Sequence, residues 1–390
     1  MTTNNTDTAV SVVTLEFAGR VVETEELIAA LPAESQAALR QFSLERTMGY
    51  GVDYADAIEL RARVLAGQSW QSAATKLAHT CQQRAGAATP TSGTPTRGAY
   101  LRRASALLRM SQMMMLTDSA ERRAIFAEAK VLYDQAAALL GDRLPIAIDS
   151  AGGALAGWFI PAAADTAQAS VIVIGGVEGW GMDFESMGDA LAARGIDALM
   201  LDGPGQGVSR LAHRHFLTAH WRQAYTAAID LLERRAPGRP IGIIGNSMGG
   251  SFAMAVATED TRIRACVSNG GIIAPWMVPP QGTFFSKMTA FCGEATETED
   301  ALNVWNTVTP ARHGPNAGYP LLMVQGGRDP LVSMEMAQML FAAAPTDDKR
   351  MVAFSDGDHC IYNHKSDRDA LVSDWIAARL GGDARAAFPF

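Results

Sequence analysis

A glycine-flanked serine at the end of an apolar run is the feature that most constrains how this chain folds. The run at 241–244 is followed by residues 245–250 (GNSMGG) and then by a helix-compatible segment at 251–256. This order predicts a strand, a tight turn with Ser247 at its apex, and a helix. Glycines two positions before and after the serine allow the helix to pack on the strand through a strained turn. We therefore predict a nucleophile elbow, which lifts the serine hydroxyl out of a sheet.

The chain after residue 144 alternates between apolar runs and helical stretches. Residues 145–149 and 154–160, separated by a glycine-containing turn, are typical of a β-hairpin. Further strands are expected at 170–174, 198–201, 240–244, 264–268, 320–324 and 350–354, with helices near 183–193, 218–234 and 368–380. Strands rich in valine, isoleucine and leucine indicate a mostly parallel, doubly wound sheet covered on both faces. The stretch 272–317 breaks this rhythm and is predicted to form a lid insertion over the sheet.

The first part of the chain is predicted to be helical throughout. Apolar positions recur at helical spacing in five stretches, which are 25–42, 54–65, 69–84, 99–116 and 120–140. Residues 85–98 are rich in Gly, Pro, Thr and Ser, which predicts a surface loop whose role the sequence does not indicate. We therefore divide the chain into a helical lid domain at 1–144 and an α/β catalytic domain at 145–390.

Composition excludes several classes of function. Of the 390 residues, 48% are hydrophobic and 19% charged, which is typical of a globular protein. The net charge of −8, without a basic block, argues against nucleic acid as a partner. The polar N-terminus is unlike a secretory signal and no apolar run is long enough to span a bilayer, so we predict a cytoplasmic protein without a membrane partner. The scattered cysteines lack metal-ligand spacing, and no glycine-rich loop has the dinucleotide pattern, so neither metal nor cofactor is expected.

A serine nucleophile needs a general base and an acidic residue that orients the base. Asp329 follows the predicted strand at 320–324, and His359 follows the one at 350–354. The chain order Ser247, Asp329, His359 is the order expected for this sheet topology. We predict these three residues as a catalytic triad. Two alternatives stay open at this point, because Asp356 or Asp358 could orient the histidine while Asp329 caps a helix.

An oxyanion hole needs two amide donors beside the serine. The amide of Met248 stands at the start of the predicted elbow helix, and Val177 lies in a glycine-rich loop after the strand at 170–174. We predict these two amides as the donors. Further residues are predicted to line the substrate pocket, and these are Glu178, Trp180, Tyr100, Trp276, Phe284, Phe285 and Met288. For Glu178 the alternative is that it only caps the following helix. Such a lining would suit an aromatic or polyketide-like small molecule.

The serine, the glycine-rich loop, Asp329 and His359 together resemble the α/β-hydrolase superfamily over most of the chain from residue 145 onward. The segments 202–207 (DGPGQG), 100–105 (YLRRAS) and 154–161 (ALAGWFIP) are similar to the group of 2,6-dihydroxypseudooxynicotine hydrolases and fungal hydrolases that shorten polyketides. The resemblance implies a helical domain that closes over the catalytic face and a homodimer. Glu178 stands where that group often has aspartate.

The resemblance implies either carbon–carbon bond cleavage in a 1,3-dicarbonyl compound or ester hydrolysis. In both reactions Ser247 would attack a carbonyl and form an acyl-enzyme. An ester leaving group needs only a proton, whereas a carbon leaving group must depart as an enol or a stabilised carbanion. Elimination of a small carboxylate with His359 as the base is a further alternative. A binding protein without activity is the alternative from another class.

Overall fold

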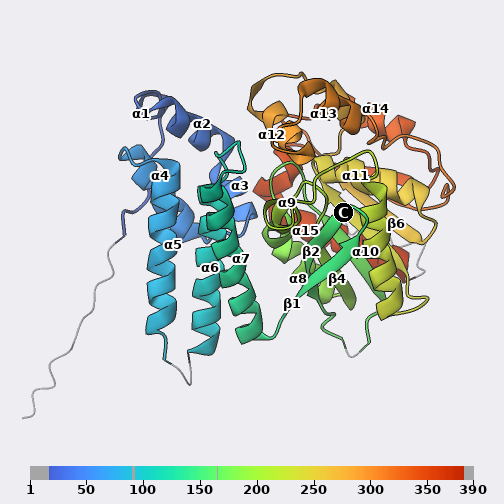
Figure 1. The fold of residues 1–390 in the computed structure, drawn as a ribbon, viewed down its shortest axis with the longest axis horizontal. Coiled ribbons are helices and arrows are strands. Elements are labelled where there is room, and N and C mark those ends of the chain that lie inside the picture. The colour runs from blue at the N-terminus through green and yellow to red at the C-terminus, as the bar shows by residue number, and fades with distance from the viewer. Residues whose placement is uncertain (1–16, 90–92, 165, 382–390) are drawn as a thin grey trace, which may run out of the picture.

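The computed structural model describes residues 17–89, 93–164 and 166–381. A layer of helices built from the first part of the chain stands beside an α/β part, and α7 is the long helix of that layer nearest the α/β part (Figure 1). The helical layer contains α1 Glu25–Ala29, α2 Ala33–Gln41, α3 Leu44–Gly49, α4 Tyr54–Leu65, α5 Trp70–Ala87, α6 Thr94–Ser111 and α7 Ala120–Leu140. Strand β1 begins at Leu144. The domain boundary at 144/145 stays a prediction.

The structure departs from the predicted helices at three places. The stretch 25–42 is broken at Pro32, which is the N-cap of α2 and has no amide to continue the hydrogen bonding of α1. Helix α3, which the sequence analysis missed, begins after Ser43, whose side chain accepts a hydrogen bond from the Arg46 amide at 3.1 Å. The predicted loop at 85–98 is shorter than expected, because α5 extends to Ala87 and α6 begins at Thr94. Residues 90–92 of that predicted loop lie outside the described part of the chain.

The α/β part contains an eight-stranded sheet in the order β1-β2-β4-β3-β5-β6-β7-β8. The strands are β1 Leu144–Ser150, β2 Gly153–Ile160, β3 Ala169–Ile174, β4 Ile196–Asp202, β5 Ile241–Asn246, β6 Ile263–Asn269, β7 Leu321–Gly326 and β8 Lys349–Phe354. The hairpin β1–β2 and the pair β2–β4 are antiparallel, and the other pairs are parallel. The predicted mostly parallel sheet is confirmed.

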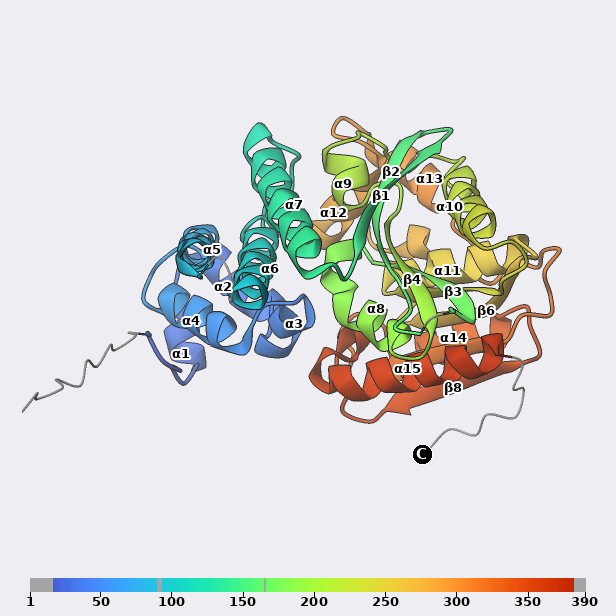
Figure 2. The ribbon, with the colours of Figure 1, turned by 90° about the horizontal axis from the view of Figure 1, so that it is seen from below.

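Helices cover both faces of the sheet, as the second view shows (Figure 2). Helices α8 Glu185–Ala192 and α15 Lys365–Leu380 pack on one face, with Leu191 and Trp375 in the same apolar core. Helices α10 Arg222–Arg235, α11 Met248–Glu259 and α14 Met334–Ala343 pack on the other. Short helix α9 Gly207–Leu211 follows β4, and the predicted lid insertion contains η2 Pro275–Met277, α12 Gly282–Cys292 and α13 Thr298–Trp305. In the ranges that the structure describes, no helix is both long and apolar enough to cross a membrane.

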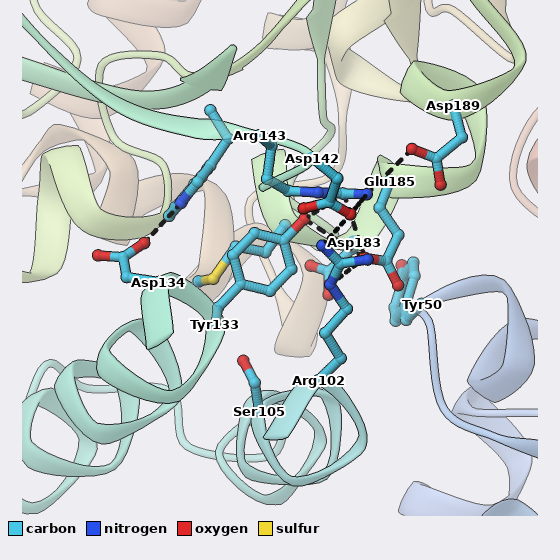
Figure 3. A network of polar contacts seen from close by, with 12 residues as sticks. Tyr50, Arg102, Ser105, Tyr133, Asp134, Asp142, Arg143, Asp183, Glu185 and Asp189 are labelled. Carbon is cyan, nitrogen blue, oxygen red and sulfur yellow. Dashed lines mark hydrogen bonds and ion pairs between the residues drawn. The ribbon is translucent and has the colours of Figure 1, made fainter. Parts of the chain in front are cut away.

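The helical layer is joined to the α/β part by apolar and charged contacts. Phe126 and Tyr133 of α7 stack edge-on against Trp180 and Trp158, at centroid distances of 5.4 Å in each case. Arg143, just before β1, donates to the Tyr133 hydroxyl at 2.7 Å, and Figure 3 shows its guanidinium among the carboxylates of Asp142, Glu185 and Asp189. These contacts fix α7 against residues 180–189, next to the loop predicted to form the oxyanion hole.

Candidate active site

Ser247 occupies a strained turn between β5 and α11. Its backbone angles are φ 57° and ψ −129°, a conformation that is rare for a residue with a side chain. The glycines explain how the turn is accommodated: a Cβ on Gly245 would overlap the Gly249 carbonyl, and a Cβ on Gly249 would overlap the Gly175 carbonyl. The sequence thus buries the backbone of the turn and leaves the serine side chain partly exposed.

His359 connects Ser247 and Asp329. Its Nε2 lies 2.8 Å from the Ser247 Oγ, and its Nδ1 lies 2.8 Å from the Asp329 Oδ2. The other carboxylate oxygen of Asp329 accepts hydrogen bonds from the amides of Leu331 at 2.8 Å and Val332 at 2.9 Å. The three side chains predicted from chain order are therefore brought into one hydrogen-bonded line, which is the geometry that general-base activation of a serine needs.

The two alternative aspartates have other partners. Asp358 accepts a hydrogen bond from the amide of Tyr362 at 2.5 Å, and Asp356 lies 2.9 Å from the ring of His364. Neither is hydrogen-bonded to His359 in the described structure. Asp329 is thus the carboxylate that the structure places against the histidine.

The backbone after His359 is also strained. Cys360 and Ile361 both have positive φ, at 62° and 59°. The Cys360 carbonyl accepts hydrogen bonds from the buried Arg368 at 2.8 Å and from Asn269 at 3.1 Å. These donors fix the turn that directs the imidazole toward Ser247.

Burial and neighbouring groups shift the pKa values of the histidine and the aspartate. Burial lowers the pKa of His359, but the neighbouring Cys360 sulfur and the hydrogen bond with Asp329 outweigh it and hold that pKa above its ordinary value. Burial raises the pKa of Asp329, but the His359 ring and the two backbone amides outweigh it and lower that pKa. The site therefore favours an ionised aspartate and stabilises the protonated form of His359.

These shifts predict the pH dependence of the reactivity of Ser247. A general base must be neutral, so reactivity falls as the pH drops through the pKa of His359. Because that pKa is raised, we expect the midpoint of the acid limb above pH 6.5, the ordinary histidine value. The rate at which a non-titrating fluorophosphonate labels Ser247, followed by mass spectrometry across pH, measures this midpoint without ionisation of a substrate. A midpoint below 6.5 would contradict the prediction.

The loop after β3 lies directly against the nucleophile. A Cβ on Gly176 would lie 2.8 Å from the Ser247 Cβ, so the backbone at 175–177 comes within van der Waals distance of the serine. Met248 is the first residue of α11, where the amide has no acceptor within the helix. Val177 lines the same cavity as Ser247. The amides of Val177 and Met248 stay our prediction for the oxyanion hole.

The segment at 202–207 supports this loop. The Gln206 side chain donates to the carbonyls of Gly175 at 2.6 Å and Gly176 at 3.0 Å. Buried Asp202 accepts hydrogen bonds from the amides of Gly181 at 2.7 Å and Val208 at 2.8 Å. These bonds orient the Gly176–Val177 peptide, so a motif that the sequence analysis used for family resemblance contributes directly to the geometry beside Ser247.

Ser247 and His359 open into a cavity of about 200 Å³. Its other lining residues are Gln41, Arg46, Tyr50, Gly176, Val177, Glu178, Phe184, Asn246, Thr283, Phe284, Lys287, Leu331 and Tyr362. The helical layer, the loop after β3 and the lid insertion therefore all contribute to the lining of the cavity. Within the described ranges, no group of three histidine, cysteine or acidic residues could hold a metal ion.

The structure places the predicted substrate contacts unevenly. Glu178 and Phe284 line the cavity. Trp180 is not part of that lining and instead packs edge-on against Phe126 of α7. The remaining predicted contacts also lie elsewhere. Tyr100 packs under the guanidinium of Arg103, Trp276 is 44% exposed at the surface, and Phe285 and Met288 are buried in the core.

Several cavity residues were not predicted from the sequence, and these are Gln41, Arg46, Tyr50, Phe184, Thr283, Lys287, Leu331 and Tyr362. Arg46 and Tyr50 belong to α3 and its C-terminal end, so they were missed together with that helix. One signal was present for Lys287. It is a charged residue on the otherwise apolar face of α12, which includes Phe284, Phe285 and Met288.

The chain is similar in sequence to proteins that are named hydrolases. The family described as "Serine aminopeptidase, S33" matches residues 165–303. The chain is 26% identical over 222 residues to 2,6-dihydropseudooxynicotine hydrolase of Paenarthrobacter nicotinovorans, covering 53% of this chain and 56% of that protein. It is 32% identical over 196 residues to hydrolase acrC of Aspergillus aculeatus, covering 44% and 45%. The chain thus spans about half the length of the curated relatives it matches.

Solved structures share the fold over a larger part of the chain. The crystal structure of 2,6-dihydroxy-pseudo-oxynicotine hydrolase superposes with a TM-score of 0.76 at 23% identity, covering 89% of this chain and 98% of that one. A structure described as AbyA5 superposes with a TM-score of 0.65 at 16% identity, covering 80% and 89%. At these identities the likeness concerns the fold, and it extends through the helical layer as well as the sheet.

Proposed function

We propose that this chain, which belongs to the α/β-hydrolase superfamily, is a serine hydrolase with Ser247 as its nucleophile. The observation that carries the proposal is the hydrogen-bonded line from Asp329 through His359 to Ser247 at the wall of a cavity. His359 takes the serine proton as the Oγ attacks a substrate carbonyl, and Asp329 stabilises the imidazolium. The amides of Val177 and Met248 receive the oxyanion, each such donor being worth about 3 kcal/mol.

The second half of the reaction releases the acyl group. The proton held by His359 passes to the leaving group, and the same histidine then activates a water molecule that attacks the acyl-enzyme. The relatives' names support a small-molecule substrate, since one is named for a pseudooxynicotine compound. Under this proposal the substrate is a 1,3-dicarbonyl, polyketide-like or aromatic compound, cleaved at a carbon–carbon bond or at an ester.

Two further parts of the proposal concern assembly and the alternatives. The homodimer implied by family resemblance stays a prediction that light scattering would test.

Elimination of a small carboxylate would use His359 as base without needing an acyl-enzyme. A binding protein without activity is disfavoured by the complete hydrogen-bonded line, because such proteins usually lack one of the three groups.

A direct test is to look for the acyl-enzyme. The protein is incubated with p-nitrophenyl acetate and, separately, with benzoylacetone, a 1,3-dicarbonyl, and is quenched in acid. Intact mass and peptide mapping should find an acetyl or acyl adduct on Ser247 with at least one of them. Turnover without any adduct on Ser247 would indicate that another group is the nucleophile, and the absence of both turnover and fluorophosphonate labelling would favour the binding protein.

A further inference from the structure

Four polar residues form one cluster on the wall of the cavity that contains Ser247. We call Gln41, Arg46, Glu178 and Lys287 the Lys287 cluster; all four line that cavity. They come from three separate parts of the chain, namely the end of α2 with α3, the loop after β3, and α12 of the lid insertion. The mechanism proposed above assigns no role to any of them.

Glu178 is the common partner within the cluster. Its carboxylate accepts hydrogen bonds from the Gln41 amide at 2.9 and 2.8 Å and from Arg46 at 3.0 Å, and it contacts the Lys287 ammonium. Lys287 also donates to the carbonyl of Met113 at 3.1 Å. The Lys287 and Glu178 side chains are 8% and 10% exposed, so the charges interact with little screening by water.

The cluster has more positive than negative charge when Lys287 is protonated. Arg46 and Lys287 share the single carboxylate of Glu178, and the next cation, Arg122, is paired with Asp118, which also pairs with Arg210. Burial, together with the Arg46 and Arg122 guanidiniums, lowers the pKa of Lys287 to about 7. An anion that enters the cavity would stabilise the buried, positively charged groups of the cluster. The attraction between opposite charges is strong there because little water screens it.

We infer that Arg46 and Lys287 bind an anionic oxygen of the substrate, a carboxylate or an enolate, while Ser247 attacks the carbonyl in the same cavity. The inference rests on the proposed function and narrows its substrate class. Glu178 holds the two cations in position and neutralises part of their charge. The cavity is small enough that a substrate seated at Ser247 shares it with both cations.

The same two cations suit a carbon leaving group. When the Ser247 Oγ bonds to the carbonyl carbon and the carbon–carbon bond breaks, the bonding electron pair becomes an enolate on the departing fragment. His359 holds the serine proton and delivers it to that fragment, and water then releases the acyl group. Overall a dicarbonyl and water give a carboxylic acid and a ketone. Arg46 and Lys287 would stabilise the enolate oxygen before protonation.

Two variants with opposite charge effects test this inference. Lys287→Met removes a positive charge at similar size, and Glu178→Gln removes a negative charge by replacing the carboxylate with an amide of the same size. We measure kcat/KM for the p-nitrophenyl monoester of glutarate, which has a free carboxylate, and for p-nitrophenyl pentanoate, its neutral counterpart. Benzoylacetone provides the enolate arm. The ratio of two substrates within one variant does not depend on the fraction that is folded.

If the cluster recognises an anion, Lys287→Met and Glu178→Gln should change the preference for the anionic substrate in opposite directions. Lys287→Met should lower the preference for the anionic substrate by about ten- to a hundredfold, because a hydrogen bond to a charged group is lost. Glu178→Gln should raise it, and Lys287→Arg, which keeps the charge, should retain it. A loss with the glutarate ester indicates a carboxylate substrate, and a loss with benzoylacetone indicates an enolate.

A purely structural ion pair would give a different result. Lys287→Met and Glu178→Gln would each break the pair and disturb the site in the same way. Both variants would then lower kcat/KM for all substrates in the same proportion. That result, or a wild-type enzyme without preference for either anionic substrate, would overturn the inference. Fluorophosphonate labelling of Ser247 is measured in parallel; if labelling persists, the proposed function stands even when the inference fails.

Discussion

Replacing Ser247 by alanine is expected to reduce kcat by about a millionfold, to the level that binding and the oxyanion donors alone sustain. The variant should fold, because alanine removes only an oxygen that points into the cavity and leaves Gly245 and Gly249 unchanged. Single-turnover assays with the best substrate from the ester and dicarbonyl panel measure the loss. Labelling by fluorophosphonate should disappear in the same variant.

The matched control is Ser286→Ala on α12. Ser286 is exposed, and its hydroxyl bonds to the carbonyl of Gly282 at 3.2 Å within its own helix. It should keep activity and labelling within about twofold, as surface changes usually do. If Ser247→Ala keeps a tenth or more of wild-type turnover, the nucleophile is another group and the proposed mechanism is wrong.

The local pattern of the sequence was sufficient to predict the sheet and the line from Ser247 to Asp329. Parallel strands end at one edge of a sheet, so residues that follow different strands meet there whatever their separation in the chain. Asp329 follows β7 and His359 follows β8, and this placement required no knowledge of side-chain packing. The strained conformation of Ser247 could be predicted because such a tight turn needs residues without a side chain on both sides of the serine, and the sequence has glycines there.

The cavity walls could not be predicted in the same way, because they depend on how the helical layer meets the sheet. Arg46 reaches Glu178 across 132 positions of sequence, and nothing local to either residue indicates the other. Trp180 shows the converse error. It is close to the oxyanion loop in sequence, yet its side chain contributes to the interface with α7. Proximity in sequence therefore predicted the path of the backbone around the site better than it predicted which side chains line the cavity.

Breaking the buried ion pair between Arg109 and Asp183 is expected to cost about 3–5 kcal/mol in the free energy of unfolding. The guanidinium Nε lies 2.7 Å from the carboxylate, and both side chains are 2% exposed. Asp183→Asn keeps the shape but leaves the Arg109 cation without a counter-charge inside the protein. The same carboxylate accepts the amide of Trp180 at 2.8 Å, so the loop beside the active site should loosen as well. Urea unfolding followed by tryptophan fluorescence measures the loss.

The double variant Arg109→Met with Asp183→Asn separates charge from packing. With both charges removed, no buried ion remains uncompensated, so most of the lost stability should return. Glu25→Gln is the surface control, because it breaks an ion pair with Arg40 whose side chains are 56% and 80% exposed, and it should change stability by less than about 1 kcal/mol. If the double variant is as unstable as Asp183→Asn, the pair acts through the shape of the interface between α6 and residues 181–184, and burial of an unpaired charge is not the cause.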